Sequence, residues 1–294
     1  MSGAVLAFVR EAIVGGRRMT RDNQKHHFVS RTYEEDGEVK TNVVLDSDVN
    51  SLYPAAMARL EGFAKGKPKF FQISKKEKQI PPCDYYIARV LITGLKKNRA
   101  FPLQSIKDEE GVRQFTNDLV GKKLIIDKTA LEDLVEFQSV SYKVIEGVYW
   151  DEGFNSRICK VMPELYNERM KLKALGNPLQ QCLKLLMNAS FGKKIQKPIV
   201  TKKRFIVGAD EIKKYTKKNI CKLLSRTTIT DNVSMFEEVK PISQHFSPAH
   251  LGDQLLSMSK RIMNEAMCLA EDIGQLSTIK TLILVMWRAD TTKR

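Results

Sequence analysis

Two aspartates at the end of an apolar run are the residues best suited to chemistry in the first part of the chain. The run occupies residues 43–54, VVLDSDVNSLYP, and is typical of a buried strand that leaves its sheet at a turn. Alternation along a strand puts Asp46 and Asp48 on the same side. Carboxylate oxygens suit a hard divalent cation. The alternative is that one or both aspartates cap the helix that follows.

A second polar pattern falls on a predicted helical hairpin. Helices are expected over residues 159–175 and 178–191, joined by a Gly-Asn-Pro turn. In that turn Asn177 can cap and Pro178 can take the first helical position. The spacing therefore predicts a hairpin of two antiparallel helices.

The polar residues of the hairpin share faces. Lys184, Asn188 and Phe191 stand at i, i+4 and i+7 on the second helix, and this mixture is unlike a plain core face. On the first helix Arg169 and Lys173 share a basic face. The alternative for the first helix is an ordinary solvated surface.

A glycine pair near the start is a further candidate for ligand contact. A short helix is expected over residues 4–14, and Gly15 and Gly16 end it before Arg17. Paired glycines let the backbone approach a partner closely, and an arginine beside them suits phosphate. A simple helix end explains the same pattern.

The rest of the chain alternates short strands and helices. Strands are predicted over residues 85–93, 124–127 and 140–145, helices over 55–61, 131–136 and 248–273, and a strand-rich return over 199–245. This mixture predicts an α+β fold.

Composition favours a polyanionic partner. The 294 residues carry a formal charge of +15, although a generally basic surface gives the same number. The five cysteines are scattered, without a CxxC pair, and are expected to be reduced core thiols in an intracellular protein. No apolar run is long enough to span a membrane, and no membrane partner is expected.

Taken together, these stretches resemble the family B DNA polymerases, in the organellar, viral and protein-primed branch. DVNSLYP at 48–54 is similar to motif A, and KLLMNASFG at 184–192 to motif B. In motif B, Ala189 stands where Ser is usual and Phe191 where Tyr is usual. The glycine pair is similar to an element that precedes motif A near the template, although Ile13 replaces its usual Tyr.

The resemblance implies a fold and a reaction. We expect a fragment of the polymerase right hand: a palm with an antiparallel sheet and a fingers subdomain made of the helical hairpin. The implied reaction is DNA-directed deoxynucleotide addition to a primer 3′ end. The expected divisions are 1–60 for the first palm part, 61–155 for a palm-associated α/β insertion, 156–192 for the fingers and 193–276 for the second palm part.

The resemblance also assigns roles to residues. Two Mg²⁺ ions would activate the primer hydroxyl and neutralise the triphosphate, with Asp48 and Val49 as ligands and Asp46 as the second choice. The nucleotide contacts would be Ser51, Leu52, Tyr53, Arg169, Lys184, Asn188 and Phe191. Tyr53 would lie under the sugar and select deoxynucleotides.

The implied partners are primer–template DNA, deoxynucleoside triphosphates and, in the protein-primed branch, a terminal priming protein. The DNA contacts would be Gly15, Gly16, Arg17, Gly192, Lys193 and Lys194. The host element, the priming chemistry and the cell compartment stay open.

One motif that the family requires is missing. A Tyr-Tyr-x-Asp-Thr-Asp-Ser motif, which supplies the second metal carboxylate, should follow residue 274, and Asp290 is too far along to replace it. One choice of codons for residues 280–284, read from the last base of codon 280, restores Asp-Thr-Asp-Ser. We therefore expect a change of reading frame near residues 275–277 and an out-of-frame tail over 277–294, with no thumb and no exonuclease domain.

Three functions follow as hypotheses. The first is a DNA polymerase fragment with little activity on its own. The second is a catalytically inactive nucleic-acid-binding remnant. The third is a reverse transcriptase or RNA polymerase, against which Tyr53 and the pattern from Lys184 to Gly192 argue.

Overall fold

The computed structural model of the chain describes residues 1, 3–17, 19, 32–35, 37–41, 51–74, 79–196 and 199–273. Its α-helices are α1 (Gly3–Ala12), α2 (Leu52–Arg59), α3 (Lys128–Gln138), α4 (Arg157–Ala174), α5 (Leu179–Ile195), α6 (Ala209–Asn219) and α7 (Ala249–Asp272). Its strands are β1 (Thr32–Glu35), β2 (Glu38–Thr41), β3 (Phe63–Ala64), β4 (Lys69–Gln72), β5 (Tyr85–Leu95), β6 (Ser105–Lys107), β7 (Arg113–Phe115), β8 (Lys123–Asp127), β9 (Val140–Trp150), β10 (Phe154–Asn155), β11 (Thr201–Val207), β12 (Leu223–Thr230) and β13 (Val233–Val239).

A four-stranded antiparallel sheet with the order β4-β9-β5-β8 is the base of the fold. Ile87 of β5 pairs with Val148 of β9 on one side and with Asp127 of β8 on the other. Ile87 and Val148 share an apolar cluster with residues of α1, and Val90 shares another with residues of α3, so helices cover both faces. The strands predicted over residues 85–93, 124–127 and 140–145 and the helix α3 are confirmed, and β9 continues five residues beyond its predicted end. The strand predicted at the start of the 43–54 stretch lies outside the described residues.

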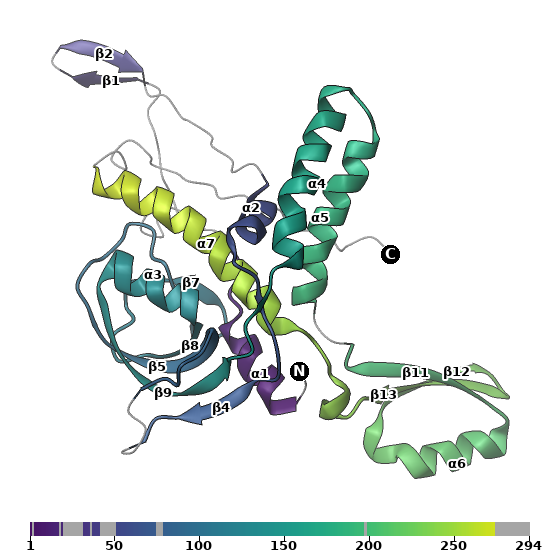
Figure 1. The fold of residues 1–294 in the computed structure, drawn as a ribbon. Coiled ribbons are helices and arrows are strands. Elements are labelled where there is room, and N and C mark those ends of the chain that lie inside the picture. The colour runs from purple at the N-terminus through teal and green to yellow at the C-terminus, as the bar shows by residue number, and fades with distance from the viewer. Residues whose placement is uncertain are drawn as a thin grey trace.

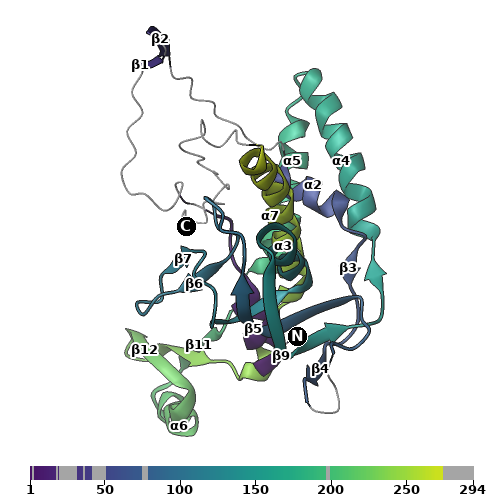
Figure 2. The same cartoon turned by 90° about the vertical axis from the view of Figure 1, so that its left-hand side faces the viewer.

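Helix α7 joins the parts of the molecule. It contributes one or more residues to each of the four apolar clusters of the described chain: Ala249, Leu255, Met267 and Cys268. In Figures 1 and 2 it runs past α3 and the sheet on one side and past α2 and α5 on the other. A displacement of α7 would therefore disturb the packing of all four of these apolar clusters.

The predicted helical hairpin is formed by α4 and α5, which project together from the body in Figure 1. The Asn177 side chain accepts a hydrogen bond from the Leu179 N–H at 3.0 Å, as expected of a cap. The hairpin is fixed at its base, where Met162 of α4 and Met187 of α5 pack with Met57 of α2. The expected α+β class, with antiparallel sheets and a helical hairpin, is confirmed.

The strand-rich return contains one element that the pattern did not predict. Strands β11, β13 and β12 form an antiparallel sheet, and α6 lies between β11 and β12 in sequence. Its Tyr215 ring lies 5.1 Å from the Phe236 ring of β13, centroid to centroid. This sheet with its helix forms a lobe away from the hairpin in Figure 1.

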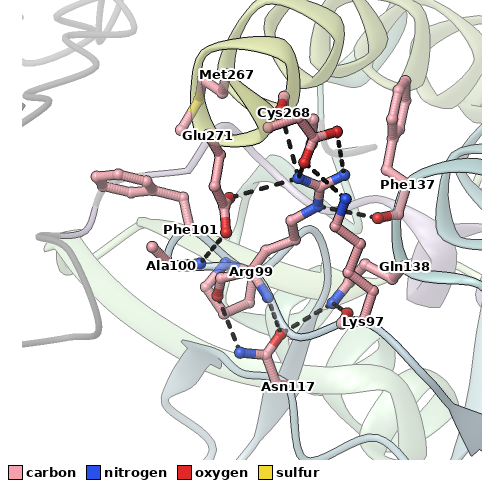
Figure 3. Close-up of polar contacts among 12 residues, drawn as sticks. Lys97, Arg99, Ala100, Phe101, Asn117, Phe137, Gln138, Met267, Cys268 and Glu271 are labelled. Carbon is pink, nitrogen blue, oxygen red and sulfur yellow. Dashed lines mark hydrogen bonds and ion pairs between the residues drawn. The ribbon is translucent and has the colours of Figure 1, made fainter. Parts of the chain in front are cut away.

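The C-terminal end of α7 is tied to the loop that follows β5 (Figure 3). The Arg99 side chain is 2% exposed; its Nη1 donates to Asp272 Oδ1 at 2.6 Å and its Nε to the Phe137 carbonyl at 2.9 Å. It also donates to the Cys268 carbonyl at 3.3 Å. A cation that binds the last carbonyls of a helix also stabilises its negative end.

All five cysteines are free thiols, as predicted. The expectation that they lie in the core holds for Cys159 and Cys268. Cys83 is half-buried, and the expectation is wrong for Cys182 on the hairpin and Cys221 in the lobe, which are exposed.

Candidate active site

The turn that leads into α2 has an unusual backbone. Ser51 has φ 55° and ψ 50°, in the left-handed region that residues with a side chain adopt rarely. Its carbonyl nevertheless accepts the first helical hydrogen bond, from Ala55 at 3.0 Å. Strained backbone of this kind gathers at ligand sites. The expected metal ligands Asp48 and Val49, and the second choice Asp46, lie outside the described residues.

The first turn of α2 is built from the residues that the sequence singled out. The helix begins at Leu52, three residues earlier than predicted, because Pro54 falls in the first turn, where its missing N–H has no intrahelical partner to lose. Leu52 is half-buried. Burial raises the pKa of Tyr53 to about 12, so its phenol stays protonated and uncharged at neutral pH.

Arg169 of α4 reaches this turn. Its Nη1 donates a hydrogen bond to Ser51 Oγ at 3.4 Å. Its Nε is buried and has no hydrogen-bond partner in the part of the chain that the structure describes. A half-buried guanidinium whose buried Nε has no partner among the described residues suits an anionic ligand. The structure thus brings together two predicted residues that are 118 positions apart.

Lys184 and Asn188 lie on α5, beside its buried face. Met187 is 1% exposed and packs against α2, which fixes the rotation of α5. Asn188 is exposed and Lys184 is half-buried, on one flank of that face. Phe191 belongs to α5, but its side chain lies outside the described residues.

Arg17 is placed in the interior, unlike the glycine pair before it. Gly15 is exposed, and a Cβ built on it would meet no atom within 4 Å, which leaves room for a partner. The Arg17 side chain turns inward instead, and burial lowers its pKa to about 10. Its predicted contact with DNA phosphate does not fit this placement.

Lys194 is buried for a reason that helical geometry supplies. It stands seven residues after Met187 and so shares the buried face of α5. Its Nζ lies 3.9 Å from the centroid of the Phe63 ring, and burial lowers its pKa to about 8. Its predicted DNA contact does not fit either. Gly192 and Lys193 are exposed, as a DNA contact requires.

The described residues do not provide a metal site by themselves. Among them, no group of three His, Cys, Asp or Glu residues is placed to hold an ion. The carboxylates that the resemblance implies belong to Asp48 and to a motif after residue 274, and both places lie outside the described chain.

Sequence reasoning missed a buried polar stripe on α7. Its members are Asp253, Ser257, Lys260 and Asn264, all at least 91% buried. Burial raises the pKa of Asp253, and Ser257 donates to Asp127 at 2.7 Å. Polar residues at i, i+4, i+7 and i+11 of a long helix were the available signal, because they share one face.

Comparisons with known proteins show the family and the fold. Residues 1–267 match the family described as DNA polymerase type B, organellar and viral. The chain belongs to this family. Among curated proteins, none matches this polymerase chain.

Solved structures of Phi29 DNA polymerase share the fold. The orthorhombic crystal form has a TM-score of 0.56 and 17% identity, over 92% of this chain and 42% of that one. The complex with primer–template DNA and incoming nucleotides has a TM-score of 0.55 and 16% identity, over 92% and 41%. The type B polymerase chain thus spans under half the length of these structures. None of its described helices is both long and apolar enough to cross a bilayer.

Proposed function

We propose that the chain is the palm and fingers part of a DNA-directed DNA polymerase, which adds deoxynucleotides to a primer 3′ end. One observation carries the proposal: Arg169 of the hairpin donates to Ser51, within the stretch similar to motif A, and its buried Nε has no hydrogen-bond partner among the described residues. The proposed divisions are 1–60 and 193–276 for the palm, 61–155 for an associated insertion and 156–192 for the fingers.

The proposed nucleotide contacts come from the family resemblance, and the contact between Arg169 and Ser51 supports them. Arg169 offers a planar fork of donors to the triphosphate, and Lys184 a point charge from the facing helix. Preorganised donors that face the place where phosphate charge develops accelerate phosphoryl transfer. The uncharged ring of Tyr53 would lie under the sugar, where a 2′-hydroxyl would clash. Asn188 and Phe191 would border the base pair, and the backbone at Leu52 would line the triphosphate.

Two Mg²⁺ ions would complete the site, held by the Asp48 carboxylate and the Val49 carbonyl. When bound, they activate the primer hydroxyl and neutralise the phosphates. The second carboxylate belongs to the motif that this sequence lacks. We therefore expect the isolated chain to bind substrates but to extend primers poorly or not at all.

DNA would lie along the exposed groups next to this site. Lys193 and the backbone at Gly192 are accessible to phosphate, and the open space beside Gly15 admits a close backbone contact. A terminal priming protein is a further partner that the protein-primed branch implies.

A binding experiment that needs no catalysis tests the proposal. The affinity for a primer–template whose primer ends in a dideoxynucleotide is measured by fluorescence anisotropy, with Mg²⁺ and either the correct or an incorrect deoxynucleotide. We expect only the correct nucleotide to tighten binding. Arg169→Met should abolish this effect, whereas Lys160→Met, at an exposed position in the first turn of α4, should leave it intact.

The same experiment separates the alternative function. An inactive nucleic-acid-binding remnant would bind the primer–template equally with every nucleotide, and that result would refute a working nucleotide site. Steady primer extension by pure protein, abolished by Asp48→Ala, would instead show that the expectation of poor activity is wrong.

A further inference from the structure

The Arg17 side chain is held by several contacts inside the protein. It is 5% exposed. Its Nη1 donates to the carbonyl oxygens of Phe101 and Pro102 at 2.9 and 3.2 Å. Its Nη2 donates to Asn264 Oδ1 at 2.6 Å and contacts Met267 Sδ at 3.3 Å. Both terminal nitrogens are therefore engaged inside the protein.

The contact continues from α7 to α3. Asn264 Nδ2 donates to Asp133 Oδ2 at 2.7 Å. The other carboxylate oxygen of Asp133 accepts a hydrogen bond from Arg261 Nε at 2.5 Å. The amide of Asn264 is thus fixed in orientation, because its oxygen faces a cation and its nitrogen faces an anion. Arg17 binds to a rigid part of the interior.

The loop segment 99–102 lies between Arg17 and the end of α7. Its Ala100 N–H donates to Glu271 Oε1 at 3.2 Å, and Arg99 binds Asp272 (Figure 3). The Phe101 side chain packs with Met267. Two arginines therefore hold this loop: Arg17, which donates to its carbonyl oxygens, and Arg99 of the loop itself, which binds α7.

We propose that Arg17 is a positioning residue, which fixes the glycine pair Gly15–Gly16 against α7 and the 99–102 loop and does not itself bind phosphate. The inference rests on the proposed function, in which the glycine pair faces DNA. Gly15 and Gly16 carry no side chain that could anchor them, so their place depends on their neighbours, the buried Val14 before them and Arg17 after them. A guanidinium serves because its two terminal nitrogens reach acceptors on the loop and on α7 at the same time, which the single ammonium nitrogen of a lysine cannot reproduce.

The conservative variant separates positioning from direct contact. Primer–template affinity is measured against salt concentration for the chain, Arg17→Lys, Arg17→Met, Asn264→Leu and the double variant Arg17→Met/Asn264→Leu, well below each melting temperature. We expect every variant to bind about threefold to thirtyfold more weakly. The salt slope should stay unchanged, and the double variant should be no weaker than the weaker single variant.

Lys193→Met is the matched control, because Lys193 is exposed and proposed to contact phosphate. Its salt slope should fall by about one. The inference is overturned if Arg17→Lys binds like the parent chain while Arg17→Met loses about one unit of slope, since that is a phosphate contact. It is also overturned if the variants melt earlier but bind DNA normally, since Arg17 then supports only the fold.

A further readout keeps the two proposals distinguishable. If the parent chain does not bind primer–template at all, the proposed function fails, and hydrogen exchange then decides the role of Arg17. Faster exchange in Arg17→Lys and Asn264→Leu, confined to the amides of residues 13–17 and 99–102, supports the positioning role. Unchanged exchange there refutes it.

Discussion

Replacement of Arg99 by methionine should lower the free energy of unfolding by about 2–3 kcal/mol. The side chain is 2% exposed and donates to two carbonyl oxygens and to both oxygens of Asp272. Removing one partner of a buried ion pair costs about 3–5 kcal/mol. The cost is smaller here because Asp272 is 42% exposed, so water can solvate the carboxylate that is left. Methionine keeps most of the apolar packing of the stem.

Urea unfolding at neutral pH, followed by circular dichroism, measures this difference. Lys97→Met is the matched control, because Lys97 binds the same carboxylate at 2.6 Å but is 47% exposed. An exposed pair of that kind contributes about 1 kcal/mol or less. We infer that the buried hydrogen bonds of Arg99, and not only its charge, anchor α7. A loss below about 1 kcal/mol for Arg99→Met, or equal losses for the two variants, would refute this inference.

The carboxylate gives an independent check. Hydrogen bonds from Arg99 and then from Lys97 lower the pKa of Asp272 to about 2. A depressed carboxyl pKa stabilises the fold above the ordinary value near pH 3.8 and loses this effect as the pH falls toward 2. The measurement at neutral pH therefore records the full contribution. In Arg99→Met, the pKa of Asp272, followed by NMR, should rise toward its ordinary value.

Two further predictions concern the interior. Gly147→Ala should destabilise the sheet by several kcal/mol in urea unfolding, because the new Cβ would lie 2.5 Å from the Ile87 carbonyl oxygen. In the control Gly94→Ala the nearest atom to the new Cβ would lie at 3.7 Å, so the cost should be less than about 1 kcal/mol. Equal losses in the two variants would contradict this reasoning. The ring of His250 stacks on that of Trp150 with centroids 4.9 Å apart, and burial lowers the pKa of His250 to about 4. The neutral imidazole therefore contributes fully to the stability of the fold above pH 6.5, and this stability is lost as the pH falls toward 4. Between pH 7 and pH 5 the free energy of unfolding should therefore fall by about 1–2 kcal/mol more in the parent than in His250→Phe. If both proteins show the same dependence of unfolding free energy on pH, the imidazole is not held neutral by burial.

The helices and strands were largely predictable, because their periodicity is local. The hairpin, strands β5 and β8 and α7 were found close to their predicted bounds, whereas strand β4 of the main sheet was not predicted. Helix α6 was missed because its apolar residues are few, although Asp210 and Glu211 at its start and Lys217 and Lys218 at its end match the helix dipole. The start of α2 was missed because Pro54 was taken as the end of a turn and not as a first-turn residue.

The candidate site was predictable only as a set of residues. Motif spacing selected Ser51 and Arg169, but nothing in the spacing showed that one donates to the other. Whether a basic residue faces water or the core depends on the rotation of its helix against the rest of the protein. For Lys194 that rotation is set by Met187, which packs against α2 from a distant part of the sequence.

The sequence by itself determined the family, the order of the elements and the residue types available for phosphate chemistry, because motifs and periodicity are written within short stretches. The tertiary structure decided which of those residues are free to use that chemistry. The sequence alone shows that Arg17 is a basic residue next to a glycine pair. Only the long-range packing of segment 99–102 and α7 around it gives its donors interior acceptors, and such contacts join residues up to 250 positions apart.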